Sequence, residues 1–227
     1  MLDGKRIRMS KKTKYITTIG MLSAIAYVFT LVGHLVPIYF TDFLKYDPKD
    51  AIIVIAGFSL GPIAAVIISV IVAFFEFITI STTGIIGFGM NVLASVCFAG
   101  IAAVIYRYKK GIKGAVLGLV ISSAVTVGAM ILWNYLITPM YVGVPREVIA
   151  TWILPIFLPF NVIKCGLNSA LVMLIYKPCV QAMRRARLLD ARQNVSVEHK
   201  PKASPMLIIS AIAIIILMIA LFIVLKQ

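Results

Sequence analysis

Residues 51–79 read AIIVIAGFSLGPIAAVIISVIVAFFEFIT, an apolar run with one acid, Glu76, and a glycine–proline pair at Gly61 and Pro62. The run is long enough to cross a hydrocarbon core of about 30 Å as a single helix. It could equally form two helices that meet at Pro62, because proline lacks a backbone N–H and disfavours helical geometry in the residue before it. Since kinked transmembrane helices tolerate proline, the local sequence leaves both possibilities open.

The distribution of basic residues decides between one helix and two. Clusters of Lys and Arg lie within residues 1–14, 107–113 and 177–202. With the first cluster inside the cell, one helix over 51–79 would place the other two clusters outside. Two helices place all three clusters inside and leave few basic residues in the outer loops. This distribution agrees with the excess of Lys and Arg that membrane proteins carry in their cytoplasmic loops. The first of these two helices, 51–60, is then only ~15 Å long. It must therefore lie deep among the other helices or begin in the preceding loop.

The composition supports a membrane protein. Of 227 residues, 61% are hydrophobic and 13% are charged, and the mean hydropathy is +1.03. A soluble domain would be nearer half apolar and a quarter charged. The net charge of +14 comes mainly from clusters beside apolar segments, which suits anionic lipid and gives no indication of nucleic-acid binding. The three cysteines and two histidines show no disulfide or metal-site pattern, and no phosphate-binding loop of an ATPase is present.

These observations predict an all-α integral membrane protein, a bundle of six transmembrane helices plus one extra C-terminal transmembrane helix. We expect a cytosolic basic N-terminus at 1–14 and a membrane domain at 15–185. A polar basic cytosolic linker follows at 186–204, and the additional transmembrane segment at 205–227. A cleaved signal peptide ending near Ala26 is the alternative for the N-terminus, but the apolar run continues to about residue 38, which favours a retained helix.

Polar side chains interrupt the apolar stretch FNVIKCGLN at residues 160–168. Asn161, Lys164 and Asn168 are spaced by three and then four residues, so they project from one face of a helix. Buried amides and charges are costly in a bilayer and usually face a protein-lined or watery cavity. Lys164 lies too deep to reach an interface easily and needs an acceptor, either a ligand or a carboxylate such as Glu76.

Other candidates fall in the middle or outer half of the expected bundle. Asn134 and Asn91 offer amides, Phe160 offers a flat apolar face, and Gly87 would allow a planar ligand to approach the backbone. Hydrogen bonds between helices are the structural alternative for the asparagines. Gly20 and Ala24, four residues apart on the first helix, predict close helix contact, either within the bundle or with a separate membrane partner.

Several of these segments resemble one known family. They are FLKYDPKD at 43–50, LGP at 60–62, TTGIIG at 82–87, LWNYLITP at 132–139, GVPR at 143–146, and LPIFLPFN at 154–161 with Lys164. Together they resemble the riboflavin-specific substrate-binding (S) component of energy-coupling-factor (ECF) transporters. The resemblance covers about residues 15–185, and the segment at 205–227 lies beyond it.

The resemblance implies a six-helix protein of a prokaryotic cell membrane that captures riboflavin from outside. Its implied partners are a transmembrane coupling protein, which would meet Gly20 and Ala24, and two cytosolic ATPases that use ATP. It also implies that the loop at 39–50 closes over the ligand and that asparagine and lysine side chains hold the flavin ring. The candidate substrate-binding residues are Tyr39, Thr41, Leu44, Gly87, Asn91, Asn134, Phe160, Asn161, Lys164 and Asn168.

Other functions remain open at this point. The ligand could be another vitamin or a flavin nucleotide, or the chain could be a carrier driven by an ion gradient. A lipid-modifying membrane enzyme could use Glu76 and Lys164 as acid and base, but no nucleophile–base pair or metal cluster accompanies them. We therefore expect no enzymatic activity and no resident cofactor or metal, with riboflavin bound only as the transported ligand.

Overall fold

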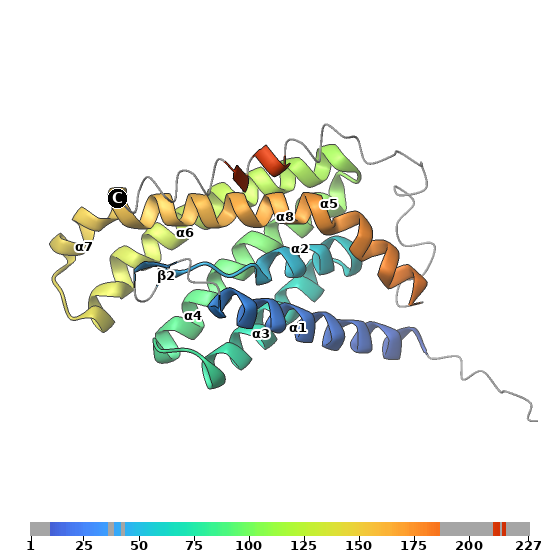
Figure 1. Cartoon of the computed structure of the whole chain (residues 1–227), viewed down its shortest axis with the longest axis horizontal. Helices are drawn as coiled ribbons and strands as arrows, with labels where there is room; N and C mark the ends of the chain where they lie inside the picture. The colour runs from blue at the N-terminus through green and yellow to red at the C-terminus, as the bar shows by residue number, and fades with distance from the viewer. Residues whose placement is uncertain (1–9, 36–38, 42–43, 187–210, 214, 217–227) are drawn as a thin grey trace, which may run out of the picture.

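The structure is a computed structural model that describes residues 10–35, 39–41, 44–186, 211–213 and 215–216. It is a helical bundle, with one short antiparallel β-hairpin between the first two helices (Figure 1). In chain order the elements are α1 (Lys11–Leu35), β1 (Tyr39–Thr41), β2 (Leu44–Lys45), α2 (Lys49–Leu60), α3 (Pro62–Thr79), α4 (Gly84–Ser95), the π-helical turn η1 (Val96–Gly100), α5 (Ile101–Tyr108), α6 (Ile112–Val142), α7 (Arg146–Trp152), the π-helical turn η2 (Ile153–Phe157) and α8 (Leu158–Arg185).

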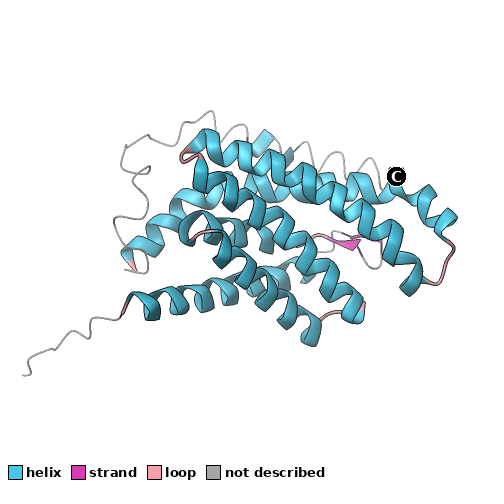
Figure 2. Cartoon of the chain, turned by 180° about the vertical axis from the view of Figure 1, so that it is seen from behind, coloured by secondary structure: helices cyan, strands magenta, loops and turns pink. Residues whose placement is uncertain are grey.

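Helical membrane architecture is confirmed. Five stretches of the described chain are long and apolar enough to cross a bilayer: Lys11–His34, Pro62–Thr79, Gly84–Tyr108, Ile112–Val142 and Arg146–Met183. The third consists of α4, η1 and α5, and the last contains α7, η2 and most of α8. Seen from behind, these long helices run alongside one another over most of the molecule (Figure 2).

The division of 51–79 into two helices is confirmed. Helix α2 ends at Leu60, and α3 begins at Pro62, whose missing N–H is not needed in the first turn of a helix. Gly61 between them has a φ of 102°, a conformation that glycine adopts without steric cost. The glycine–proline pair therefore ends α2 and starts a new helix, and residues 51–79 do not form one kinked helix.

Helix α2 lies deep in the bundle, as its short length predicted. Every side chain from Lys49 to Ser59 is buried, and α2 packs against α1, α3, α5 and α8. The helix also begins two residues before 51, within the preceding loop, as its short length allowed. Lys49 and Asp50, which belong to the predicted outer loop, form the first turn of α2 and are buried.

The predicted count of six transmembrane helices plus one is only partly tested. With 12 residues, α2 falls short of a full span, so the described chain has five candidate spans around one short buried helix. Most of the predicted seventh segment, 205–227, and of the linker, 186–204, lies outside the described residues. Within 211–216, Ala211 is buried beside a groove between α6 and α8.

The positions of the basic clusters agree with the prediction that all three lie on the same side of the membrane. The start of α1, the turn between α5 and α6, and the end of α8 lie at the same end of the bundle (Figure 1). Those positions carry the described parts of the three basic clusters, and the β-hairpin and α7 lie toward the other end. One consistent inside face is what the positive-inside rule requires of such clusters.

Close packing around α2 gives a testable prediction. A Cβ atom at Gly57 would lie 2.7 Å from Cβ of Ala103 on α5 and 3.1 Å from Cβ of Ala65 on α3. Gly57→Ala is therefore expected to lower the free energy of unfolding by about 1–3 kcal/mol, the usual cost of overpacking a core. Thermal unfolding in detergent measures the change.

Gly128→Ala on α6 is the matched control, because a Cβ there meets nothing within 4 Å. It should leave stability unchanged or raise it by up to about 1 kcal/mol, since alanine favours helix more than glycine does. Equal melting temperatures for the two variants would contradict the close approach of α2 to α5.

Candidate functional site

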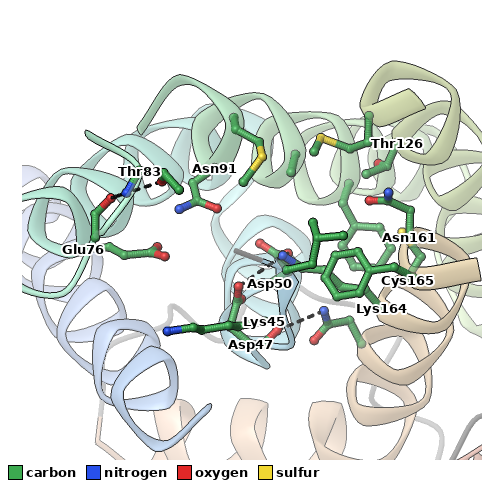
Figure 3. A pocket seen from close by; sticks show the side chains of 18 of the residues that line it. Lys45, Asp47, Asp50, Glu76, Thr83, Asn91, Thr126, Asn161, Lys164 and Cys165 are labelled. Carbon is green, nitrogen blue, oxygen red and sulfur yellow. Dashed lines mark hydrogen bonds and ion pairs between the residues drawn. The ribbon is translucent and has the colours of Figure 1, made fainter. Parts of the chain in front are cut away.

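A polar pocket lies between α3, α4, α6 and α8 and the segment that leads from β2 into α2. Figure 3 shows Asp47 and Asp50 near its centre, Glu76 and Asn91 on one side, and Asn161 and Lys164 on the other. The pocket is lined by His34, Leu44, Lys45, Asp47, Asp50, Glu76, Ile80, Ser81, Thr82, Thr83, Met90, Asn91, Ala94, Phe98, Thr126, Met130, Phe160, Asn161, Lys164, Cys165 and Asn168.

The predicted polar face of α8 lines this pocket. Asn161, Lys164 and Asn168 all contribute to its wall, as their helical spacing predicted, and Phe160 lies beside them. The π-helical turn η2 leads directly into this part of α8 and contains Pro155, which cannot donate a backbone hydrogen bond. Such turns recur at functional sites, where they change the direction in which the following side chains point.

The carboxylate that pairs with Lys164 is Asp47, whereas the sequence had offered Glu76 as one alternative. Lys164 Nζ lies 3.1 Å from Oδ2 of Asp47 and 4.0 Å from Oδ2 of Asp50. Glu76 Oε2 instead lies 2.6 Å from Nζ of Lys49. The considered Glu76–Lys164 ion pair is therefore wrong, since each residue has a different partner in the described structure.

Asp47, Lys49 and Asp50 complete a buried ionic network that sequence reasoning missed. All three residues are at most 5% exposed, and Nζ of Lys49 also lies 3.4 Å from Oδ2 of Asp47. Asp50 Oδ1 accepts a hydrogen bond from Oγ of Ser95 at 2.5 Å. The signal was available in the sequence. Asp47, Lys49 and Asp50 lie directly before the apolar run at 51–60, which is too short to span a bilayer, so these charged residues had to lie deep in the bundle with it.

Asp47 is the shared acceptor of this network. Burial alone would raise the pKa of its carboxyl group, but the nearby cations Lys164 and Lys49 outweigh burial and lower the pKa to about 2. At neutral pH the carboxylate is therefore ionised and holds both lysines. The network ties α8 and α3 to the segment that enters α2.

The amides of the pocket differ in how far they are already engaged. Asn161 Nδ2 donates to the carbonyl of Phe157 at 2.7 Å, and its Oδ1 accepts nothing from the described residues. The Asn91 side chain makes no hydrogen bond within the described part of the chain. Both amides can therefore bond to a ligand without breaking an existing contact.

Asn134 does not line the pocket in this structure. Its side chain is fully buried, with Nδ2 donating to the carbonyl of Met130 at 2.7 Å and Oδ1 accepting from Thr138 at 3.0 Å. Met130, one turn away, lines the pocket in its place. Asn134 could reach a ligand there only by giving up hydrogen bonds within its own helix.

The remaining candidates are distributed around the site. Leu44 is buried in the pocket wall. Tyr39 and Thr41 form β1 next to it, but their side chains lie outside the described residues. Gly87 does not line the pocket. A side chain at Gly87 would overlap the hydroxyl of Thr83, and Thr83 forms the wall at that point.

The small residues of α1 face away from the bundle. Gly20 and Ala24 are exposed, whereas Ser23 and Ala26 on the same helix are buried. A Cβ atom at Gly20 would meet nothing within 4 Å. Packing against the described residues therefore does not account for the pair, and within the described part of the chain this strip of α1 is open to contact with another membrane protein.

Comparisons with known proteins agree on one family. The protein-family model for the substrate-specific component of ECF transporters matches residues 14–176 of the sequence. The riboflavin transporter RibU of Staphylococcus aureus (strain TCH60) is 27% identical over 190 residues, which cover 81% of this chain and 100% of that protein. The riboflavin transporter FmnP of Bacillus subtilis (strain 168) is 28% identical over 189 residues, covering 78% and 99%.

A solved structure shows the same fold. It is described as the S component of a bacterial ECF transporter and superposes with a TM-score of 0.65. Its sequence is 28% identical, and the match covers 77% of this chain and 99% of that one. The chain described here therefore contains the full length of these relatives and extends beyond them.

Proposed function

Because the chain belongs to the substrate-specific components of ECF transporters, we propose that it is the riboflavin-binding membrane subunit of such a transporter. It captures the vitamin from outside and releases it inward when an ATP-driven module acts on it. The polar face of α8, with Asn161, Lys164 and Asn168 in one pocket, is the observation that supports binding here.

The pocket suits a flavin chemically. The pyrimidine edge of the flavin ring presents carbonyl oxygens and one imide N–H, which match the donors and acceptor of an amide. Asn161 and Asn91 have unused hydrogen-bonding atoms toward the pocket. Lys164 supplies positive charge near the carbonyls, and Phe160, Met130 and Leu44 provide apolar surface for the ring.

Ligand binding has to rearrange part of the ionic network. Lys164 is held by Asp47 in the segment between β2 and α2. A flavin carbonyl that bonds to Lys164 competes with that carboxylate, so binding and the position of the segment at 39–50 depend on each other. Asn134 can also contact the ligand if its side chain gives up its hydrogen bonds to Met130 and Thr138 and bonds to the ligand in their place.

The transport step requires partners. We propose that a transmembrane coupling protein docks on the exposed strip of α1 around Gly20 and Ala24, and that two cytosolic ATPases act through it. The end of the bundle that carries the basic clusters then faces the cytosol, which places the N-terminus inside. The protein itself binds the vitamin without transforming it.

Ala24→Leu tests the docking strip. A leucine side chain prevents the close approach that small residues allow between helices, so riboflavin uptake by vesicles containing this chain and its ECF module should fall at least about tenfold. Riboflavin affinity of the isolated chain should not change, because Ala24 is exposed on α1 and lies outside the pocket. Val120→Leu, at an exposed position of α6, is the control and should transport normally.

Uptake into vesicles also separates the alternative functions. A riboflavin transporter of this family should import radiolabelled riboflavin only when the ATPases and ATP are present. Excess unlabelled thiamine or biotin should not compete. Import that follows a sodium or proton gradient without ATP would favour an ion-driven carrier. Competition by another vitamin would indicate that riboflavin is not the specific substrate.

A further inference from the structure

An apolar groove lies between α6 and α8 on the surface of the bundle. Its wall carries small side chains from both helices, among them Ala124 on α6 and Gly166 and Ser169 on α8. Larger apolar side chains on the same wall, such as Val116 and Val162, are exposed. Because small residues let a neighbouring helix come close in a membrane, this surface has the composition of a helix-packing site.

The described part of the C-terminal segment lies against this groove (Figure 1). Ala211 forms part of the wall and is only 2% exposed. The described residues of the segment are helical, and Ile215, four positions after Ala211, is half-buried. Ile212 and Ile216 are 45% and 62% exposed. Because positions four apart share one face of a helix, one face of the segment is directed toward the groove and the other faces away.

We propose that the apolar segment at 205–227 is a seventh transmembrane helix that docks in the α6–α8 groove of its own chain. A helix of this length measures ~34 Å, enough to cross the hydrocarbon core. Helix α8 ends at the end of the bundle that carries the basic clusters (Figure 1). The basic linker at 186–204 stays on that side, so the seventh helix starts there and runs antiparallel to α8.

The segment of the same chain is favoured over a second copy by its tether. The linker at 186–204 can span up to ~60 Å when extended, so it reaches the groove easily from the end of α8. A tethered segment acts at an effective concentration in the millimolar range, which a separate copy does not match. The family model ends at residue 176, and the chain extends beyond the relatives that it matches. The seventh helix is therefore an addition to the outside of the shared fold.

Docking in this groove has two consequences for the bundle. Cys165 lines both the groove and the polar pocket, so the seventh helix supports α8 directly behind the pocket wall. Residues 211–216 and α1 lie on opposite sides of the bundle in both views (Figures 1 and 2). The docked helix therefore leaves the strip around Gly20 and Ala24 open to a partner.

The first test is cross-linking in the full-length chain, in lipid vesicles, with its three natural cysteines changed to alanine. Ala211→Cys is combined with either Ser169→Cys or Met173→Cys, which lie on the same wall of the groove. A short thiol-specific cross-linker should join at least one of these pairs. Ala213→Cys with the same partners is the matched control, because Ala213 is exposed. Its cross-linked yield should be at least about fivefold lower, since such links form only between thiols that come close together.

A mixture of isotope-labelled and unlabelled chains shows where each link forms, because mass spectrometry distinguishes linked peptides from one chain and from two. Links within one chain support the inference. Links only between chains would overturn it in favour of a second copy in the groove. Equal yields from Ala211→Cys and Ala213→Cys, or no link to α8 at all, would also overturn it and leave the groove to lipid.

The second test uses stability. Ala211→Leu should lower the melting temperature in detergent by at least about 2 °C, because a larger side chain overpacks a buried helix contact. Ala213→Leu makes the same change on the exposed side of the segment and should melt like the wild type. Equal melting temperatures for the two variants would contradict docking through the face of Ala211.

These outcomes are independent of the proposed function, because neither cross-linking nor melting requires a bound ligand. A wild-type chain that binds riboflavin, together with variants that form no link to α8, would contradict only the docking of the seventh helix. A chain whose segment links to α8 but that binds no flavin would contradict only the proposed function.

Discussion

Lys164→Met is expected to weaken flavin binding at least about tenfold, which corresponds to ~1.4 kcal/mol or more. The substitution keeps the length and apolar stem of the side chain but removes the ammonium group that faces the pocket. Hydrogen bonds from a charged donor contribute more than neutral ones, and Lys49 cannot take over this role because Glu76 and Asp47 hold its ammonium group. Titration of flavin fluorescence against purified protein measures the change.

The control for this variant is Lys113→Met at the exposed start of α6, where the same chemical change is far from the pocket. Its affinity should match that of the wild type. If Lys164→Met also bound flavin normally, Lys164 would serve only to hold Asp47 and the segment before α2, and the assignment of the ring-binding face would be wrong.

Lys49→Met is expected to be the most destabilising single change in the network. Lys49 is 1% exposed and lies between Glu76 and Asp47, at 2.6 Å and 3.4 Å from their carboxylate oxygens. Its removal takes the cation from the buried carboxylate of Glu76 and leaves Asp47 with Lys164 alone, a loss of about 3–5 kcal/mol for pairs of this kind. The melting temperature in detergent should fall far below that of Lys113→Met.

A double variant shows whether the loss comes from the unpaired charge. In Lys49→Met combined with Glu76→Leu, both members of the shortest pair become apolar, so part of the lost stability should return. Thermal unfolding of the two single variants and the double variant gives the interaction energy directly. If the double variant lost as much free energy of unfolding as the two single variants together, the charges of the pair would not stabilise the bundle.

The sequence predicted the features that repeat along the chain or depend on counting charges. The spacing of Asn161, Lys164 and Asn168 located one wall of the pocket without any structure. The positions of basic clusters decided that 51–79 is two helices, and Gly61 and Pro62 mark the boundary as expected. Both arguments use only the geometry of a helix and the asymmetry of a membrane.

Features that depend on tertiary contacts could not be predicted in this way. Charged residues beside an apolar run usually lie in a loop, so Lys49 and Asp50 were placed outside. Only the packing of α2 among other helices turns them inward and gives Glu76 a nearer partner than Lys164. Asn134 shows the same limit, because its hydrogen bonds to Met130 and Thr138 depend on a rotamer that no sequence pattern specifies.

Absorption and fluorescence in detergent show directly whether this chain binds riboflavin. Protein purified after growth with riboflavin should absorb in the visible range of the flavin. Ligand-free protein should quench the fluorescence of added riboflavin at micromolar concentration or below, saturating at one flavin per chain. A colourless protein that leaves the fluorescence of micromolar riboflavin unchanged would show that the chain does not bind riboflavin.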